Sequence, residues 1–193
     1  PIEILALFGD SPGALAVSAD GNTVYASVFK SGNQTTTLSE GVVCDGGPSA
    51  APCESMPGEA TSPGGLPAPN ADGNSIPQPE VGLIVKYDGA AWRDELNRDW
   101  SNQVRFDLPD LDVFAIDAAA PVPEELQAFP SVGTVLFGMV VNPASGRLYV
   151  SNTEAINQVR FLGPRPTGSS ITTVQGHIAE ARITVIDPSV GLV

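Results

Sequence analysis

The chain has 193 residues, of which 42% are hydrophobic and 16% are charged, a composition that supports a buried core and excludes a disordered chain. Its 20 Gly and 18 Pro indicate many turns and little helix, and no apolar run reaches the length of a membrane helix. The formal net charge is −13 with only 9 Lys and Arg, so the acidic surface would repel nucleic acid. We interpret this charge as a solubility feature, although it could also attract cations or a basic partner.

The first elements predicted along the chain are strands. Residues 2–8 are mostly apolar, which predicts a strand buried on both faces. Residues 14–18 and 23–29 predict a β-hairpin, because the segment between them, Ala-Asp-Gly-Asn, is rich in turn residues. The sequence starts at Pro1 without an initiator Met or a signal peptide, so we expect a processed product or a piece of a longer chain.

A change of composition follows the first hairpin. Residues 35–80 are rich in Gly, Pro, Ala and Ser, which predicts a long insertion with little regular structure. Cys44 and Cys53 lie inside it, and we predict a disulfide between them, because no His or second Cys pair lies near enough to complete a metal site. Such a disulfide would contribute roughly 2–3 kcal/mol and would indicate an oxidising compartment.

The strand pattern returns at residues 81–87, after the insertion. Residues 90–100 then predict a short helix or an amphipathic loop that carries Trp92 and Trp100. Two interpretations are open for these rings. They could flank a partner site, or they could pin the insertion to the body of the domain, as buried aromatic side chains usually do.

An acidic segment precedes the next predicted strand, at residues 113–116. It contains Asp107, Asp110 and Asp112, and a similar set of oxygen-bearing side chains occurs at residues 70–74. Calcium ions take six to eight oxygen ligands, but neither set has the complete spacing of an EF-hand loop. Asp and Asn are also ordinary turn residues, so a calcium site and simple turn chemistry are both open here.

The first hairpin is repeated later in the chain without a gap. An apolar run at residues 138–141 leads into a turn at residues 143–146, and the strand that follows matches Tyr149 with Tyr25. A strand that ends in Ile-Asp after the first hairpin also has a counterpart, at residues 183–187. Repeated β units of this kind indicate radial or solenoid stacking.

The remaining segments connect or interrupt these repeats. Residues 121–130 predict a connector with room for one helical turn, and residues 155–180 predict a second insertion. The single histidine, His177, lies in this insertion; it is a metal ligand, a general base, or a structural or surface side chain. A His-based triad also needs an activated Ser or Cys. In a functional role we expect His177 beside Trp92 and Trp100 on an interaction face.

The run Leu-Tyr-Val-Ser-Asn at residues 148–152, together with Ile-Thr-Val-Ile-Asp at residues 183–187, resembles the YVTN-type β-propeller repeat. The resemblance implies an all-β fold over residues 1–193, as part of a β-propeller with about two blades of four-stranded antiparallel sheet. It also implies that both long insertions open on one face. Because propellers close with about 4–8 blades, the remaining blades or other chains would complete the ring.

Such enlarged repeats are similar to those of bacterial secreted propellers that carry c-type haem modules. This sequence has no Cys-x-x-Cys-His, so haem would have to be carried elsewhere in the parent polypeptide. We therefore expect a periplasmic or extracellular propeller segment without catalysis or a cofactor of its own, acting as a scaffold or as a protein- or ligand-binding surface on the insertion face. The alternatives are a domain of a haem-containing oxidoreductase whose redox centre lies outside this chain, and a calcium-dependent structural or adhesive surface protein.

Overall fold

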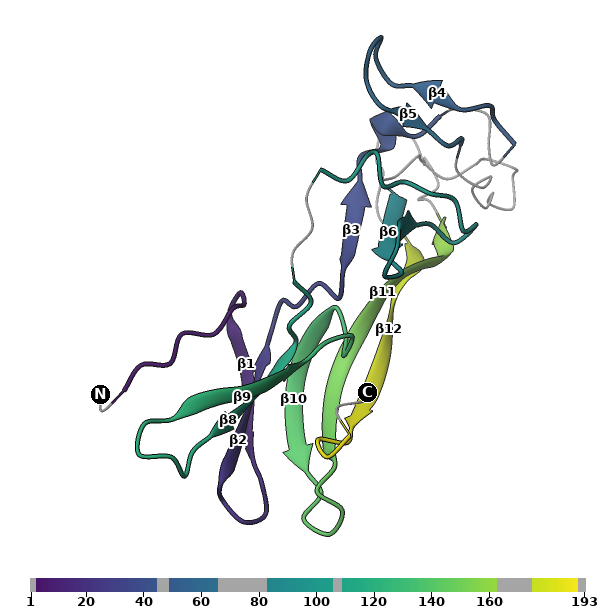
Figure 1. Ribbon diagram of the computed structural model, residues 1–193. Helices are drawn as coiled ribbons and strands as arrows, with labels where there is room; N and C mark the ends of the chain where they lie inside the picture. The colour runs from purple at the N-terminus through teal and green to yellow at the C-terminus, as the bar shows by residue number, and fades with distance from the viewer. Residues whose placement is uncertain (1–2, 45–48, 66–82, 106–108, 163–174, 191–193) are drawn as a thin grey trace, which may run out of the picture. The chain divides into compact units, whose positions relative to one another are not determined.

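The computed structural model describes residues 3–44, 49–65, 83–105, 109–162 and 175–190 (Figure 1). In these residues the regular elements are strands, apart from one 3₁₀ turn at Glu40–Val42, which confirms the all-β class. Contacts divide the chain into two compact units. The first unit consists of Pro1–Gln34, Leu108–Glu154 and Ala181–Val193, and the second consists of Thr35–Asp107 and Ala155–Glu180.

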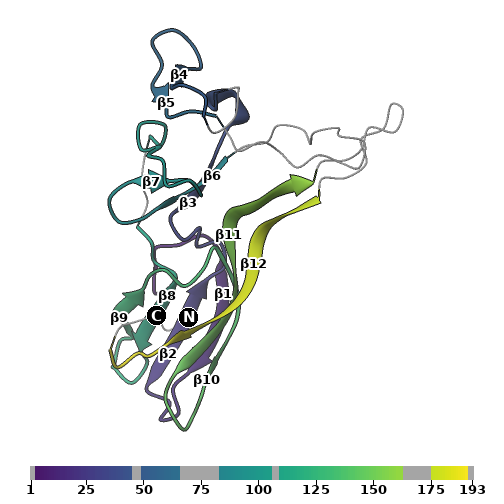
Figure 2. The same cartoon turned by 90° about the vertical axis from the view of Figure 1, so that its right-hand side faces the viewer.

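Two sheets make up the first unit. Sheet 1 has the strand order β1-β2-β8-β9, with every neighbour antiparallel, and sheet 2 has the order β10-β11-β12. Figure 2 shows β11 and β12 side by side along sheet 2. The strands are β1 (Pro12–Val17), β2 (Thr23–Val28), β8 (Val113–Asp117), β9 (Glu124–Phe129), β10 (Val135–Val141), β11 (Leu148–Leu162) and β12 (Gln175–Ile186); the last two extend into the second unit.

Both hairpins predicted from the sequence repeat are present, and they have the same register. In the first hairpin Ala16 pairs with Tyr25, and in the second Val140 pairs with Tyr149. The same register follows from turns of equal length, because the turn fixes which residues of the two strands face each other. The repeat in the sequence is therefore a repeat in the structure.

The first strand of each hairpin also carries a β-bulge at the matching place. A bulge leaves a backbone group without its ladder partner, and a serine on the next strand supplies one. The Ala14 amide donates to the Ser27 hydroxyl at 2.8 Å, and the Gly138 amide donates to the Ser151 hydroxyl at 3.0 Å. Each hydroxyl thus satisfies the amide that the irregular pairing frees.

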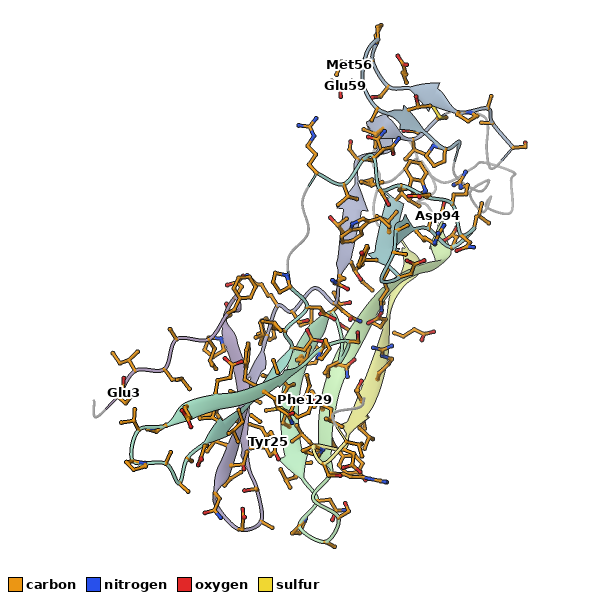
Figure 3. All side chains as sticks on the ribbon, viewed as in Figure 1. Glu3, Tyr25, Met56, Glu59, Asp94 and Phe129 are labelled. Carbon is orange, nitrogen blue, oxygen red and sulfur yellow. A yellow bond between two sulfur atoms is a disulfide. The ribbon has the colours of Figure 1, made fainter. Side chains whose placement is uncertain are left out.

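The hydrophobic core of the first unit lies between the two sheets. Tyr25 and Phe129, labelled in Figure 3, are buried there. Burying one large apolar side chain contributes about 1.5–3 kcal/mol, so this interface is the main source of stability for the unit. The other buried members of the core are Val113 and Ala115 of sheet 1, Leu136, Leu148, Val150 and Ile186 of sheet 2, and Val132 between the sheets.

Two predictions about local structure are wrong. The segment predicted as a buried strand at residues 2–8 forms no strand over its described part, and Ile4 is 77% exposed. An apolar run becomes a strand only when a neighbour supplies backbone partners, and here no described strand does so. Conversely, residues 121–130 contain the strand β9, because Phe129 and its alternating neighbours pair along β8.

The second unit contains two smaller sheets. One has the order β3-β6-β7, and the other pairs β4 with β5. Among the described residues of this unit, the buried core side chains are Leu38, Leu83, Val85, Trp92 and Trp100. The strands are β3 (Thr35–Leu38), β4 (Cys53–Glu54), β5 (Thr61–Ser62), β6 (Leu83–Tyr87) and β7 (Trp92–Arg93). The predicted insertion therefore begins with a strand, although its composition indicated little regular structure.

Candidate functional site

Buried polar side chains gather where the two long inserted segments leave and rejoin the sheets of the first unit. Ser31 and Asn33 follow β2, where the first inserted segment begins, and Asp112 stands just before β8, where the chain has returned. Glu154 and Arg182 flank the second segment in the same way. We name this set, together with the backbone of Val132, the junction network.

Asp112 is the centre of the junction network and is fully buried, with 0% of its surface exposed. One of its carboxylate oxygens accepts a hydrogen bond from the Ser31 hydroxyl. The other accepts from the amides of Val132 at 2.5 Å and Gly133 at 3.3 Å. Burial, and after it the nearby carboxylate of Asp110, raises the pKa of Asp112 to about 7. At neutral pH a large share of the protein molecules therefore carries a proton on this carboxyl group.

The other half of the junction network is an ion pair between buried Glu154 and half-buried Arg182. The Glu154 carboxylate accepts hydrogen bonds from the side-chain amide of Asn33 at 2.5 Å and from the Arg182 guanidinium at 3.0 Å. Arg182 also donates to the carbonyl of Val132 at 3.2 Å. Val132 is therefore held by its amide from Asp112 and by its carbonyl from Arg182, which fixes the connection between β9 and β10. Buried charges held in this way favour one arrangement of the chain over alternatives.

The residues predicted to bind a metal ion are only partly brought together. Asp110 and Asp112 lie close to each other, whereas Asp107 lies outside the described residues. One Asp110 oxygen accepts from the Ser131 amide at 2.7 Å, so N–H groups, which cannot coordinate a cation, already face both carboxylates. Among the described residues no three His, Cys, Asp or Glu side chains form a metal-binding group. Turn chemistry accounts for these contacts, and calcium binding stays a prediction.

The predicted disulfide between Cys44 and Cys53 is confirmed. The sulfur atoms are 2.04 Å apart and the two Cα atoms 5.9 Å apart. Cys53 opens β4, and Cys44 forms an isolated bridge with Gly65, so the bond braces a part of the second unit that has little core of its own. Structural disulfides form and persist mainly in oxidising compartments.

The two tryptophans are buried in the second unit. The Trp100 indole donates to the Asp94 carboxylate at 3.0 Å, and the Arg98 guanidinium, 2.7 Å from that carboxylate, lies 5.5 Å from the Trp100 ring centre. Asp94 is labelled in Figure 3. Trp92 packs in the same core, so both rings are buried among residues of the second unit itself. His177 belongs to β12, and its side chain lies outside the described residues.

Apolar side chains remain exposed on the outer faces of sheets 1 and 2, the faces turned away from their shared core. Larger contiguous patches of this kind mark contact surfaces. The exposed side chains are Leu15, Val17 and Leu126 on sheet 1, and Val140, Ile183 and Val185 on sheet 2. The sequence does not predict that these residues are exposed, because exposure depends on how the sheets pack.

The repeat relates these exposed faces to the buried ones. Four residues of sheet 1 face sheet 2: Ala16, Tyr25, Val113 and Ala115. In the repeat their counterparts in sheet 2 are, in the same order, Val140, Tyr149, Ile183 and Val185. In sheet 2 three of these four are the exposed residues of its outer face. Conversely, exposed Leu15 and Val17 of sheet 1 match Met139 and Val141, which pack into the core. The sheets therefore pack head to tail, each through a different face.

No family model, curated protein or solved structure matches this chain. In the described part of the chain, no helix has the length and apolar character needed to cross a membrane.

Proposed function

We propose that this chain is a sector of a β-propeller that acts outside the cytoplasm as a non-catalytic scaffold or binding surface. The observation that carries the proposal is the head-to-tail packing of sheets 1 and 2. Sheet 1 packs against sheet 2 through one face, and sheet 2 packs against sheet 1 through the opposite face of the repeated unit. Each sheet of the pair therefore leaves exposed the face through which a further copy of the repeat could pack. Stacking of this kind continues until it closes into a ring, which is how propeller blades protect their surfaces.

The partners of the proposed sector are therefore further repeats of the same sheet, supplied by other chains or by other parts of a longer polypeptide. Exposed Val140 and Ile183 on sheet 2 and Leu15 on sheet 1 are the side chains they would cover. The disulfide supports a periplasmic or extracellular setting, because such bonds persist in oxidising compartments. The second unit, built from both inserted segments, is the proposed surface for a protein or ligand partner.

Size-exclusion chromatography with light scattering tests the packing part of the proposal. We expect the chain to self-associate through its free faces, and we expect Val140→Lys to weaken this association because a charge would be buried at the contact. Val122→Lys is the matched control, because Val122 is 60% exposed against 61% for Val140 but lies in the turn between β8 and β9. Equal association of the two variants would contradict the proposal.

A further inference from the structure

The hairpin of β4 and β5 ends in a turn whose shape is set by its own sequence. The turn reads Met56-Pro57-Gly58-Glu59, and the Glu59 amide donates to the Met56 carbonyl at 3.0 Å. Proline fixes its own φ, and Gly58 after it has a φ of 88°, which is what a type II turn requires. The Gly58 amide also donates to the Glu54 carboxylate at 3.0 Å. These bonds restrict the backbone of residues 54–59, the apex of the hairpin, to one conformation.

Contacts outside the apex hold the hairpin in place. The disulfide ties β4 to the chain before it. On the other strand, the side-chain amide of Asn102 donates to the Thr61 carbonyl at 2.5 Å. The side-chain amide of Gln103 donates to the Ala60 carbonyl at 2.6 Å and to the Ser62 hydroxyl at 3.1 Å. Among the described residues, the core of the second unit takes no side chain from this hairpin, so polar bonds and the disulfide brace it and leave its apex uncovered.

The apex exposes an apolar side chain among acidic ones. Met56 is 63% exposed, whereas Met139, the other methionine of the chain, packs against the core of the first unit. Glu54 and Glu59 flank Met56 in the sequence and are exposed as well, and Figure 3 labels Met56 and Glu59 in this loop. The Arg105 guanidinium lies 3.9 Å from the Glu59 carboxylate, but exposed pairs of this kind are weak. From residue 31 to residue 85 the sequence has six acidic residues and no Lys or Arg.

We infer that the apex is a docking element for a basic protein segment that sets an apolar face among Lys or Arg side chains. The inference rests on the proposed function, because it names the contact through which the second unit would bind its partner. A methionine adapts to irregular apolar surfaces, and the acidic surroundings complement a cationic partner and speed its encounter. The fixed backbone of the apex lowers the conformational entropy that is lost on binding, so that a small contact can be effective.

Isothermal titration calorimetry of the full chain with a short amphipathic peptide of Leu and Lys, at low salt, tests the inference. We expect binding, and we expect Met56→Ser to weaken it about tenfold, because the apolar contact is lost while the charge is kept. Leu96→Ser is the matched control and should leave the affinity unchanged, because Leu96 is 43% exposed but lies in the turn after β7 of the same unit. A peptide in which Ser replaces every Leu keeps the charge and should bind the parent protein about tenfold more weakly.

Gly58→Ala tests whether the fixed turn matters. A Cβ at Gly58 meets no atom within 4 Å, so this variant removes no contact, yet the positive φ disfavours a residue with a side chain. The apex would then spend less time in the docking conformation. We expect the Leu and Lys peptide to bind about fivefold more weakly, because only the fraction of molecules in that conformation binds it.

Docking at the apex is overturned if the Leu and Lys peptide does not bind, if the Ser peptide binds equally well, or if Met56→Ser and Leu96→Ser have the same affinity. Amide NMR shifts separate this failure from a failure of the proposed function. Peptide-induced shifts elsewhere in the second unit, with no effect of Met56→Ser, would refute docking at the apex and leave the second unit as the partner surface. Shifts confined to the first unit would contradict both.

Discussion

Replacing Asp112 with Asn should remove a large part of the pH dependence of stability. Asp112 is fully buried, and its pKa is raised to about 7 from the model-compound value of 3.8. The folded state therefore binds this proton more readily than the unfolded state does. The sign follows directly: the stabilising effect of the proton is complete below the unfolded pKa and is lost as the pH rises through the folded value.

The size of the effect follows from the same two values. Between about pH 5 and about pH 8 the free energy of unfolding should fall by about 2–3 kcal/mol through Asp112 alone. Asparagine is neutral at both pH values, and its side-chain oxygen can still accept from the Val132 amide. The Asp112→Asn variant should therefore be about as stable as the parent at the lower pH and more stable at the higher one.

Urea unfolding followed by far-UV circular dichroism at both pH values measures this difference. The other titrating groups are common to both proteins, so their contributions cancel when the two pH profiles are subtracted. Identical pH profiles for the parent and the variant would refute the reasoning. It would mean that Asp112 stays ionised when buried, with Ser31 and the two amides balancing its charge.

Two further predictions concern local contacts. Replacing Cys44 and Cys53 together by Ser should destabilise the second unit by about 2–3 kcal/mol, which is the chain-entropy value for so short a loop. Protease cleavage between the two positions should then become faster, and an unchanged cleavage rate would contradict this prediction. Replacing Ser27 by Ala should cost about 1–2 kcal/mol in urea unfolding, because the Ala14 amide at the bulge loses its acceptor. A change below about 0.5 kcal/mol would show that water replaces the hydroxyl there.

Local signals in the sequence were sufficient for the hairpins and the disulfide. The turns of both hairpins carry their own chemistry, and the match of Tyr25 with Tyr149 indicated that the second hairpin repeats the first. Cys44 and Cys53 are so close in sequence that a loop between them could bring them into bonding range. These features depend on neighbours along the chain, which a sequence displays.

Features that depend on a partner strand could not be predicted in this way. Residues 121–130, with prolines at both ends, predict a connector, yet β8 offers them a partner edge and β9 forms there. The apolar residues 2–8 predict a strand, although no described neighbour pairs with this segment. Local pattern states what a segment can form, and the availability of an edge decides whether it does.

The junction network was missed for a related reason, although one signal was present. Asp112 and Arg182 occupy the same place in the two repeats, immediately before the matched segments at residues 113–117 and 183–187. A charged residue at this matched position in both repeats indicates a structural partner, whereas the sequence pattern around Asp112 predicts only a metal ligand or a turn residue. That Arg182 pairs with Glu154 could be known only once β11 and β12 lay side by side.

The junction network also makes the inserted segments interchangeable parts. Because it holds the departure and return points of both segments, the closing of each loop is fixed within the sheets and not by the segment itself. Doubling the length of a flexible loop then costs only about 0.6 kcal/mol. Segments of very different length and composition could therefore replace the one between Asn33 and Asp112 with little effect on the core of the first unit. The two sheets would stay the same while the inserted segment varies.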